Sequence, residues 1–455
     1  MQNFCVRDIV NATKGTLLCG DIDREVCNVS TDSNNIPGKT LFVPIIGERV
    51  DAHKFIDSAI NNGAVAVFTS EHDEMSGDVP YIRVSNTTMA LQELGKAYGH
   101  KMIMPKIGVT GSVGKTTTKE MIACALSAGY RVFKTSGNSN SQIGVPLTLL
   151  QIGMEDQIAV IEMGMSMRGE MSRLAELVEL DDAVITNIGV SHIEQLKTQD
   201  GICDEKFHIE DALHTEDGVV FINGDDDILK RRKSELKHQV ITFGLDSRND
   251  YYATDIKVKN GGIRFIINIK NKGSYRAKIN VLGEHNVRNA LVAVAVANRH
   301  GVPIPDAVEA LADYEGVSMR QQISVCNEII LIDDSYNASP ASMKAGIDVL
   351  CSVENTGRKI AVLADMLELG EKTKEYHSEV GEYISSRDVD ELILFGEFAE
   401  SIGQSSGKKY VCFNTREEIN EYLKNSLKKG DAVLFKGSRS MKLNEWADYI
   451  KGEMA

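Results

Sequence analysis

The segment IGVTGSVGKTTTKE at residues 107–120 places glycines, a lysine and threonines directly after a short apolar run. Such a loop lets backbone N–H groups converge on phosphate oxygens, while Lys115 adds a cation and the Thr116 hydroxyl can ligate Mg²⁺ at a helix N-terminus. The residues expected to hold nucleotide phosphates are Gly111, Ser112, Gly114, Lys115, Thr116 and Thr117. The segment therefore predicts a phosphate-binding loop.

The loop is a shortened variant, because Val109 stands where the strict G-x-x-x-x-G-K-[ST] pattern has glycine. A plain glycine turn before a helix is the alternative for these residues alone. A simple P-loop kinase or ATPase would also account for the loop, but not for the polar segments farther along the chain.

Glu162 follows the apolar run QIAVIEMG, and Asn187 and His192 follow AVITNIG. Ligands of parallel sheets bind at the carboxyl ends of the strands, so these residues are expected at the same edge as the phosphate loop. A carboxylate facing the Thr116 hydroxyl suits Mg²⁺, which prefers oxygen ligands. His192 taken alone fits a hydrogen-bonded surface or core histidine better than a magnesium ligand.

Lys206 falls on the apolar face of a helix expected to begin at residues 200–201. The face is formed by Ile202, Lys206, Ile209 and Leu213, spaced i, i+4, i+7 and i+11. One interpretation is a packed stem whose ammonium reaches water. The other is that burial lowers the pKa of Lys206, so that its neutral amine is modified or catalytic.

The elements that position these residues alternate between strand and helix. Residues 106–110 read as a buried strand, residues 289–301 as an Ala-rich helix, and residues 255–281 as an antiparallel hairpin excursion. After residue 314 the runs EIILID, KIAVLAD, ELILFG and AVLFKG predict a second, smaller parallel sheet. The fold class is α/β.

Length and composition support three domains in an ordinary globular chain. The 455 residues are 42% hydrophobic and 25% charged, and the expected domains span residues 1–84, 85–313 and 314–455.

The net charge of -15 disfavours nucleic acid as a partner, since binding to nucleic acid needs a dense basic surface. No apolar stretch approaches about 20 residues, so we expect a cytoplasmic protein without a membrane span. The eight scattered cysteines predict reduced packing residues.

Several segments together resemble the Mur ligase superfamily, in particular its D-alanyl-D-alanine-adding branch. They are TGSVGKTTTKE, GNSNSQIGVPLTLL (137–150), IEMGMSMRGEM, TNIGVSHIEQL, GEHNVRNAL (283–291), DDSYNASPASM (333–343), ADMLELG (364–370) and KGSRSMK (436–442). The resemblance covers the whole chain. It implies a UDP-binding first domain, a central ATPase domain and a Rossmann-like last domain that binds the incoming dipeptide.

The resemblance also implies roles for individual residues. Lys115 and Thr116 would hold ATP phosphates and magnesium, Glu162 would be a metal ligand, and His192 would lie near a second magnesium ion. Lys206 matches a carbamylated lysine whose added carboxylate helps to hold that second ion. The implied catalytic residues are Lys115, Lys206, His192 and Arg320; the further nucleotide contacts are Asn286, Asn289, Arg320, Asp334, Tyr336 and Asn337.

The implied substrate contacts are Thr31, Asp32, Ser33, Asn138, Lys436, Ser438 and Arg439, the first three at the UDP end. The sequence departs from the family pattern at Asn34, where arginine is usual, at the segment EKFHI around Lys206, and at Ser339, where asparagine is usual.

The implied reaction joins D-alanyl-D-alanine to UDP-N-acetylmuramoyl-tripeptide through an acyl phosphate, with ATP and two magnesium ions, in a monomer. The departures leave two alternatives: a divergent paralogue that joins another amine to a UDP-linked or peptide carboxylate, or a non-catalytic nucleotide-binding protein. A folate polyglutamylating ligase would not need the UDP-type first domain. The diaminopimelate-adding sibling would carry an Asp-Asn-Pro-Arg motif that the last domain lacks.

Overall fold

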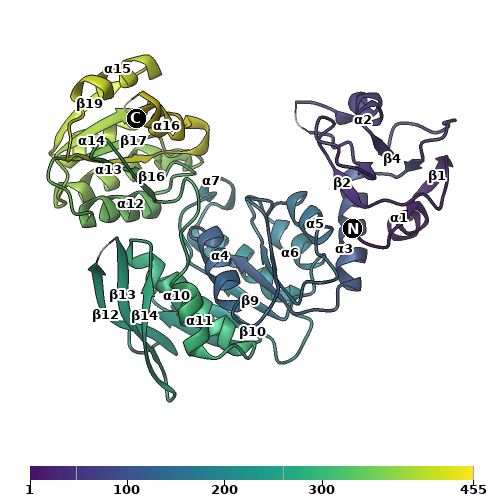
Figure 1. Ribbon diagram of the computed structural model, residues 1–455, viewed down its shortest axis with the longest axis horizontal. Helices are drawn as coiled ribbons and strands as arrows, with labels where there is room; N and C mark the ends of the chain where they lie inside the picture. The colour runs from purple at the N-terminus through teal and green to yellow at the C-terminus, as the bar shows by residue number, and fades with distance from the viewer. Residues whose placement is uncertain (48, 260, 454–455) are drawn as a thin grey trace.

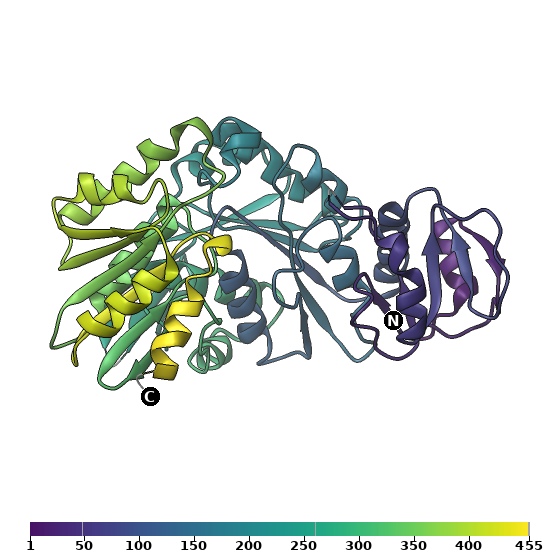
Figure 2. The same cartoon turned by 90° about the horizontal axis from the view of Figure 1, so that it is seen from above.

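Three α/β domains follow one another along the chain, each built on its own sheet (Figure 1). The computed structural model describes residues 1–47, 49–259 and 261–453. The N-terminal domain lies at one end of the molecule, and the C-terminal domain lies over the central one at the other end (Figure 2). The expected three-domain α/β architecture is confirmed.

The N-terminal domain has a five-stranded sheet in the order β1-β5-β4-β3-β2. Its strands are β1 (Thr16–Cys19), β2 (Asn28–Ser30), β3 (Thr40–Phe42), β4 (Ala64–Thr69) and β5 (Tyr81–Arg83), with β1 antiparallel and the rest parallel. Its helices are α1 (Val6–Thr13), η1 (Ala52–Phe55) and α2 (Ile56–Asn61).

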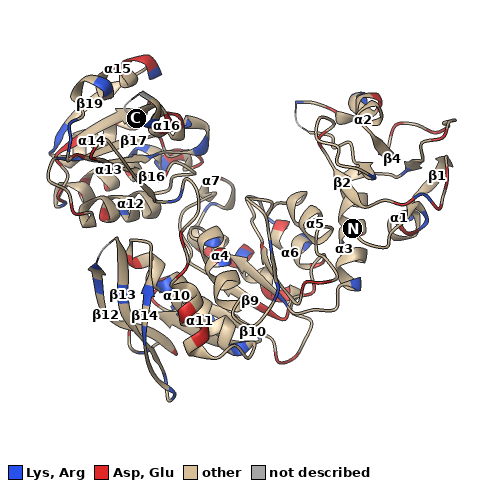
Figure 3. Cartoon of the chain, viewed as in Figure 1, with Lys and Arg blue, Asp and Glu red and all other residues tan. Residues whose placement is uncertain are grey.

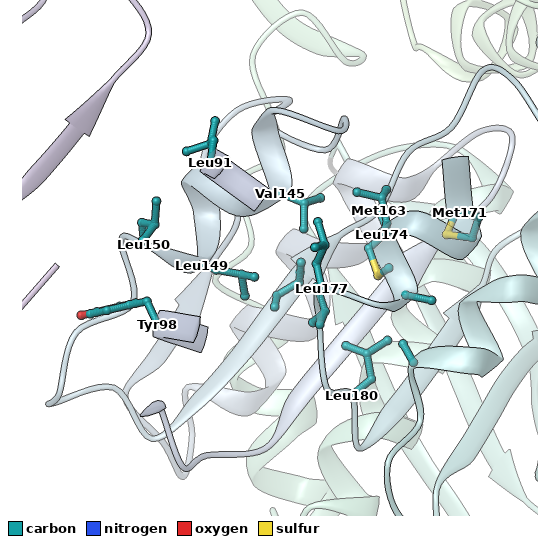
Figure 4. Close-up of a cluster of buried hydrophobic side chains, with 14 of the residues drawn as sticks. Leu91, Tyr98, Val145, Leu149, Leu150, Met163, Met171, Leu174, Leu177 and Leu180 are labelled. Carbon is teal, nitrogen blue, oxygen red and sulfur yellow. The ribbon is translucent and has the colours of Figure 1, made fainter. Parts of the chain in front are cut away.

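Helix α3 (Thr87–Lys101) joins the N-terminal domain to the central one. Tyr98 is fully buried, and its hydroxyl donates to the Ile152 carbonyl at 2.8 Å. A Cβ added at Gly95 would lie 2.7 Å from the Pro146 Cβ, so glycine permits the close approach of α3 to α5 (Gly144–Leu149). Figure 4 shows the buried cluster that continues from Leu91 and Tyr98 to Met171 in the central domain.

The central domain has a nine-stranded sheet in the order β14-β13-β12-β11-β10-β9-β6-β8-β7. Its strands are β6 (Lys106–Thr110), β7 (Val132–Lys134), β8 (Ile158–Glu162), β9 (Asp182–Ile185), β10 (Val219–Asn223), β11 (Gln239–Gly244), β12 (Tyr251–Lys259), β13 (Gly262–Ile269) and β14 (Gly273–Ile279). The strands from β6 to β11 are parallel.

The predicted antiparallel excursion is present within the central domain. It is a three-stranded meander, β12 to β14, and β12 pairs in parallel with β11, so the meander extends the main sheet at one edge. Alternating burial along β13 explains this, because one face packs on the core while the other stays partly open.

Helices cover both faces of the central sheet. On one face α4 (Lys115–Leu126), α10 (Glu284–Arg299) and α11 (Ile304–Leu311) share a core with Val109, Val160 and Phe221. The other face carries α5 and α6 (Glu170–Ala175) over Ile161 and Ile185. The remaining central helices are α7 (Ile193–Leu196), α8 (Gln199–Phe207), η2 (His208–Ala212), α9 (Asp227–Arg232) and η3 (Lys233–Glu235).

The C-terminal domain has a six-stranded sheet in the order β15-β16-β20-β17-β18-β19. Its strands are β15 (Gln322–Cys326), β16 (Ile329–Asp333), β17 (Lys359–Ala364), β18 (Glu391–Phe395), β19 (Lys409–Phe413) and β20 (Ala432–Lys436). The four predicted strands β16, β17, β18 and β20 are parallel as expected, and an unpredicted strand, β15, adds an antiparallel hairpin with β16 at one edge. Both β15 and β19 are half-exposed edge strands, so they lack the continuous apolar run of a buried strand.

The helices of the C-terminal domain are α12 (Pro340–Ser352), η4 (Gly370–Lys372), α13 (Thr373–Ser385), α14 (Glu400–Ser406), α15 (Arg416–Ser426), η5 (Arg439–Met441) and α16 (Asn444–Glu453). Ser339 caps α12: its side chain accepts from the Ser342 N–H, and Pro340 opens the helix.

Acidic and basic residues are interspersed along the ribbon of all three domains in Figure 3. Within the described residues, no helix has the length and apolar content needed to cross a bilayer.

Candidate active site

The phosphate loop lies between β6 and α4, at the carboxyl edge of the central sheet. Gly111 and Gly114 adopt φ values of +148° and +86°, which lets the chain turn sharply into the helix. The first-turn N–H groups of α4 have no intrahelical partner and stand beside the cavity. Lys115 is folded back, with its Nζ donating to the Gly111 carbonyl at 2.7 Å.

Asn187 holds the loop from the neighbouring strand end. Its backbone oxygen accepts from the Ser112 N–H and its Oδ1 accepts from the Val113 N–H, both at 3.0 Å. The Ser112 hydroxyl in turn accepts from the Gly189 N–H at 2.8 Å. Ser112 therefore helps to shape the loop. The first-turn N–H groups of α4 are the ones that remain available to bind a phosphate.

Glu162 faces the start of α4, as its position after β8 predicts. It is 1% exposed; its Oε2 accepts from the Thr116 hydroxyl at 2.9 Å, and its Oε1 accepts from Asn140 Nδ2 at 2.6 Å. A carboxylate beside a hydroxyl at the end of a phosphate loop is an oxygen donor set that suits Mg²⁺.

Lys206 lies on the buried face of α8 and is 2% exposed. Burial lowers its pKa well below the ordinary value, and the charge of Lys115 adds to this effect. The predicted helix start was wrong by two residues: Thr198 caps the helix and accepts from the Gly201 N–H. Of the face predicted with Lys206, Ile202 and Ile209 are buried, whereas Leu213 lies beyond a 3₁₀ turn and is only partly covered.

His192 caps α7 with a φ of +64° and lines the cavity. Its Nδ1 lies 2.8 Å from Glu368 Oε2 of the C-terminal domain, within ion-pair range, although the oxygen is off the N–H direction. Glu368 also has a left-handed backbone, at φ +62°, and its side chain is half-exposed. The contact joins two domains beside the phosphate loop.

The C-terminal side of the site contributes a guanidinium and a buried ion pair. Arg320 Nη2 donates to the Thr116 hydroxyl at 3.0 Å, and its guanidinium lies 4.0 Å from the Tyr336 ring centre. Lys436 Nζ lies 2.7 Å from Asp334 Oδ2 and donates to the Asn337 carbonyl at 3.1 Å. Burial raises the pKa of Asp334, and the Lys436 ammonium opposes that shift.

Two asparagines on α10 meet the phosphate-loop helix. Asn289 Oδ1 accepts from the Thr118 hydroxyl at 3.1 Å, and Asn289 Nδ2 donates to Asn286 Oδ1 at 3.1 Å. His285 stands beside them in the cavity wall, and burial lowers its pKa to about 4.

These groups surround one cavity of about 700 Å³ between the central and C-terminal domains. The predicted residues that line it are Ser112, Gly114, Lys115, Thr116, Thr117, Asn138, Glu162, Asn187, His192, Asn286, Asn289, Arg320, Asp334, Tyr336, Asn337 and Lys436. Gly111 and Lys206 are not lining residues, but Gly111 accepts from Lys115 Nζ and Lys206 is close enough to Lys115 to feel its charge. The volume accommodates a nucleotide together with part of a second substrate.

Five predicted substrate residues lie outside this cavity. Ser438 and Arg439 are near it in the C-terminal domain: the Ser438 hydroxyl accepts from the Leu367 N–H at 2.9 Å, and Arg439 lies 5.8 Å from the Tyr336 ring centre. Thr31, Asp32 and Ser33 follow β2 in the N-terminal domain. There the Asp32 carboxylate accepts from the Asn34 N–H at 2.9 Å, which shapes the turn locally.

Sequence reasoning missed several residues of the wall, among them Asn140, His285, Tyr314 and Gln321. Asn140 follows β7, so the rule that ligands bind at carboxyl strand ends could have found it. Tyr314 carries no such signal, because its place in the wall depends on how α11 packs against α4.

Family comparisons match all three domains. The chain matches the Mur ligase family catalytic domain over residues 25–99, the Mur ligase middle domain over residues 109–297, and the Mur ligase glutamate ligase domain over residues 319–439.

Individual relatives match over nearly their full length. The chain is 39% identical to UDP-N-acetylmuramoyl-tripeptide–D-alanyl-D-alanine ligase of Bacillus subtilis, covering 97% of this chain and 96% of that one. It is 33% identical to the ligase of the same name from Escherichia coli, covering 98% of each chain.

Solved structures agree in fold. A crystal structure of MurF from Acinetobacter baumannii superimposes with a TM-score of 0.90 at 29% identity, covering 99% of each chain. MurF ligase from Thermotoga maritima in complex with ADP superimposes with a TM-score of 0.83 at 28% identity, covering 94% of this chain and 97% of that one. With the matches above, these likenesses show that the chain belongs to the Mur ligase family.

Proposed function

We propose that this protein is an ATP-dependent ligase that joins D-alanyl-D-alanine to UDP-N-acetylmuramoyl-tripeptide in the assembly of peptidoglycan precursors. The observation that carries the proposal is the cavity that puts a phosphate loop opposite Arg320 and Lys436 of another domain. The full-length likeness to ligases of that name supports the choice of substrates and favours it over a divergent paralogue or a non-catalytic binder.

Residues of the central domain fit ATP and one magnesium ion. The N-terminus of α4 and Lys115 would bind the phosphates, with Lys115 turning away from the Gly111 carbonyl to do so. Thr116 and Glu162 would hold the ion, since their oxygens already face each other at 2.9 Å. Bound magnesium supplies neutralisation of the charge that develops on the phosphoryl oxygens.

A second magnesium ion would be held by His192 and a carbamylated Lys206. The donor chemistry fits, because burial favours the neutral amine and only a neutral amine can add carbon dioxide to form a carbamate. The addition forms an N–C bond and releases one proton, and it converts an amine into an oxygen ligand. Among the described residues, the Lys206 amine has no hydrogen bond or ion pair that would compete for its lone pair.

The first chemical step activates the terminal carboxylate of the tripeptide. A carboxylate oxygen attacks the γ-phosphorus of ATP, the bond to the bridging oxygen breaks, and ADP leaves. Negative charge spreads over the transferring group, and Lys115 and Arg320 would stabilise it from opposite domains.

The second step forms the amide. The amine of the dipeptide attacks the acyl carbon and gives up one proton. The bond between the acyl carbon and the phosphate oxygen breaks, and phosphate leaves. Closure of the C-terminal domain over the central one would bring the amine to the acyl phosphate and exclude water. Asp334, Tyr336 and Asn337 would close over the nucleotide, with Asn286 and Asn289 near its base or ribose.

The substrate ends are assigned to domains. Thr31, Asp32 and Ser33 would bind the UDP end, within an N-terminal domain of residues 1–84. Asn138 would contact the peptide, within a central domain of residues 85–313. Lys436, Ser438 and Arg439 would bind the dipeptide, within a C-terminal domain of residues 314–455. We also propose that the protein is a monomer and works in the cytoplasm.

Phosphate release with single omissions tests this function. Purified protein with MgATP, UDP-N-acetylmuramoyl-tripeptide and D-alanyl-D-alanine should release phosphate and give a product heavier than the tripeptide precursor by the dipeptide less one water. Omitting either UDP-N-acetylmuramoyl-tripeptide or D-alanyl-D-alanine should abolish the release of phosphate. Release that does not depend on the dipeptide would contradict the choice of amine and favour the divergent paralogue.

A further inference from the structure

Lys119 carries a buried ammonium directly behind the metal-binding carboxylate. The residue lies one turn after Lys115 on α4 and its side chain is fully buried. Its Nζ donates to the Thr135 carbonyl at 2.6 Å, lies 3.0 Å from Glu120 Oε1, and lies 3.9 Å from Glu162 Oε2. A lysine is rarely buried completely, and it stays buried when it is paired.

Glu162 depends on the same small network. Its backbone N–H donates to the Thr135 hydroxyl at 2.9 Å, while the Thr135 carbonyl accepts from Lys119. Thr135 directly follows β7 and is fully buried, so it anchors both the carboxylate and the following loop that carries Asn138 and Asn140. Lys119 thus fixes two sides of the site at once.

Lys119 is also the cation near Glu162 that stays in place, 3.9 Å from its Oε2. Lys115 stands in front of Glu162 but must turn to the phosphates whenever nucleotide binds. Arg320 belongs to the C-terminal domain and would shift with it on closure over the central domain. Lys119 can make neither of these movements, because its side chain is fully buried and its ammonium donates to the Thr135 carbonyl.

We infer that Lys119 is a positioning residue that holds the Glu162 carboxylate in the orientation needed by the divalent cation at the phosphate loop. Lys119 does not touch substrate. This inference rests on the proposed function, because it concerns the metal site of that reaction. Groups that orient a metal ligand contribute about 10- to 100-fold to metal affinity or activity.

The test is a Mn²⁺ titration followed by electron paramagnetic resonance on the full-length protein, without nucleotide. Lys119→Met keeps the length of the stem and removes the charge, and it should weaken Mn²⁺ binding about tenfold. Lys134→Met is the matched control, because Lys134 pairs with the other oxygen of Glu120 from a half-exposed position. The control should bind Mn²⁺ like the wild type.

A metal-rescue experiment separates positioning from a folding defect. Phosphate release by Lys119→Met should recover as free Mg²⁺ is raised about tenfold, whereas the affinity for UDP-N-acetylmuramoyl-tripeptide, measured by calorimetry, should not change. If Lys119→Met does not fold, Lys119→Gln, which keeps a donor without charge, takes its place with the same expectations.

Unchanged or tighter Mn²⁺ binding in the variant would overturn the inference, and so would lost activity that added Mg²⁺ does not restore. Wild-type protein that binds no Mn²⁺ would instead count against the metal site of the proposed function. The two failures are therefore distinguishable.

Discussion

Replacing Lys206 by methionine should stabilise the unloaded protein and disable it. The substitution keeps the stem and removes an amine that is 2% exposed. Burying a polar group without a compensating bond costs roughly 1–3 kcal/mol in protein mutational data. For a domain of the size of the central one, that corresponds to a rise in Tm of about 2–10 °C.

The pH dependence has a definite sign. Burial lowers the folded-state pKa of Lys206 below its ordinary value of 10.5, so the unfolded chain binds the proton first. The stability cost therefore appears as pH falls below 10.5, and it is absent above that pH. The Tm advantage of Lys206→Met should be larger at pH 7 than at pH 10.

The assay is thermal unfolding in buffers free of carbon dioxide and divalent metal, with Lys197→Met as the control. Lys197 is exposed, so the same chemical change there should leave Tm unaltered. In bicarbonate with Mg²⁺, Lys206→Met should lose at least about 10- to 100-fold in kcat, because it cannot form the carbamate ligand. A ¹³C carbamate signal from labelled bicarbonate should appear in the wild type and be missing in the variant.

A destabilised Lys206→Met protein that retains full ligase activity would refute this reasoning. It would mean that the amine has a protonated structural role in the folded chain.

Other changes give further tests. Arg320→Met should lower kcat about 10²- to 10³-fold, because it removes a charge aimed at the transferring phosphoryl group, while affinity for UDP-N-acetylmuramoyl-tripeptide in calorimetry stays the same; an unchanged kcat would argue against that role. Gly111→Ala should abolish binding of a fluorescent ADP analogue, since its Cβ would lie 1.9 Å from Thr186 Oγ1 at a φ of +148°. Normal binding would show that the loop can relax. His285, with a pKa lowered by burial to about 4, is neutral when folded, so protonation of the unfolded chain should cost up to about 3 kcal/mol between pH 6.5 and 4. Some solvent access through the cavity makes that figure an upper bound. In urea unfolding, the free energy of unfolding of His285→Gln should fall less steeply with decreasing pH than that of the wild type; an equal slope in both proteins would exclude the histidine as the source of the pH dependence.

Local patterns predicted the parts of the site that one strand and the following turn can build. The phosphate loop and the Glu162 position follow from glycine spacing and from the rule that ligands bind at strand ends. The buried face of α8 followed from apolar periodicity, although the cap was misplaced because Thr198 competes with Asp200 for that position.

Features that depend on packing between distant segments could not be predicted from local patterns. The contact of His192 with Glu368 requires the placement of one domain over another. The edge strands β15 and β19 were missed because their half-exposed sides lack a continuous apolar run. In the sequence, Lys119 looks like an ordinary exposed lysine of a helix. It is buried only because β7 and β8 pack beside α4 in the folded chain.

Transfer of ¹⁸O from the tripeptide carboxylate tests the central claim most directly. UDP-N-acetylmuramoyl-tripeptide labelled in its terminal carboxylate is incubated with MgATP, D-alanyl-D-alanine and the protein, and the released phosphate is analysed by mass spectrometry. Activation through an acyl phosphate predicts one ¹⁸O atom in each phosphate for every amide formed. Unlabelled phosphate would contradict the account, because it would show that water, and not the substrate carboxylate, attacks ATP in this cavity.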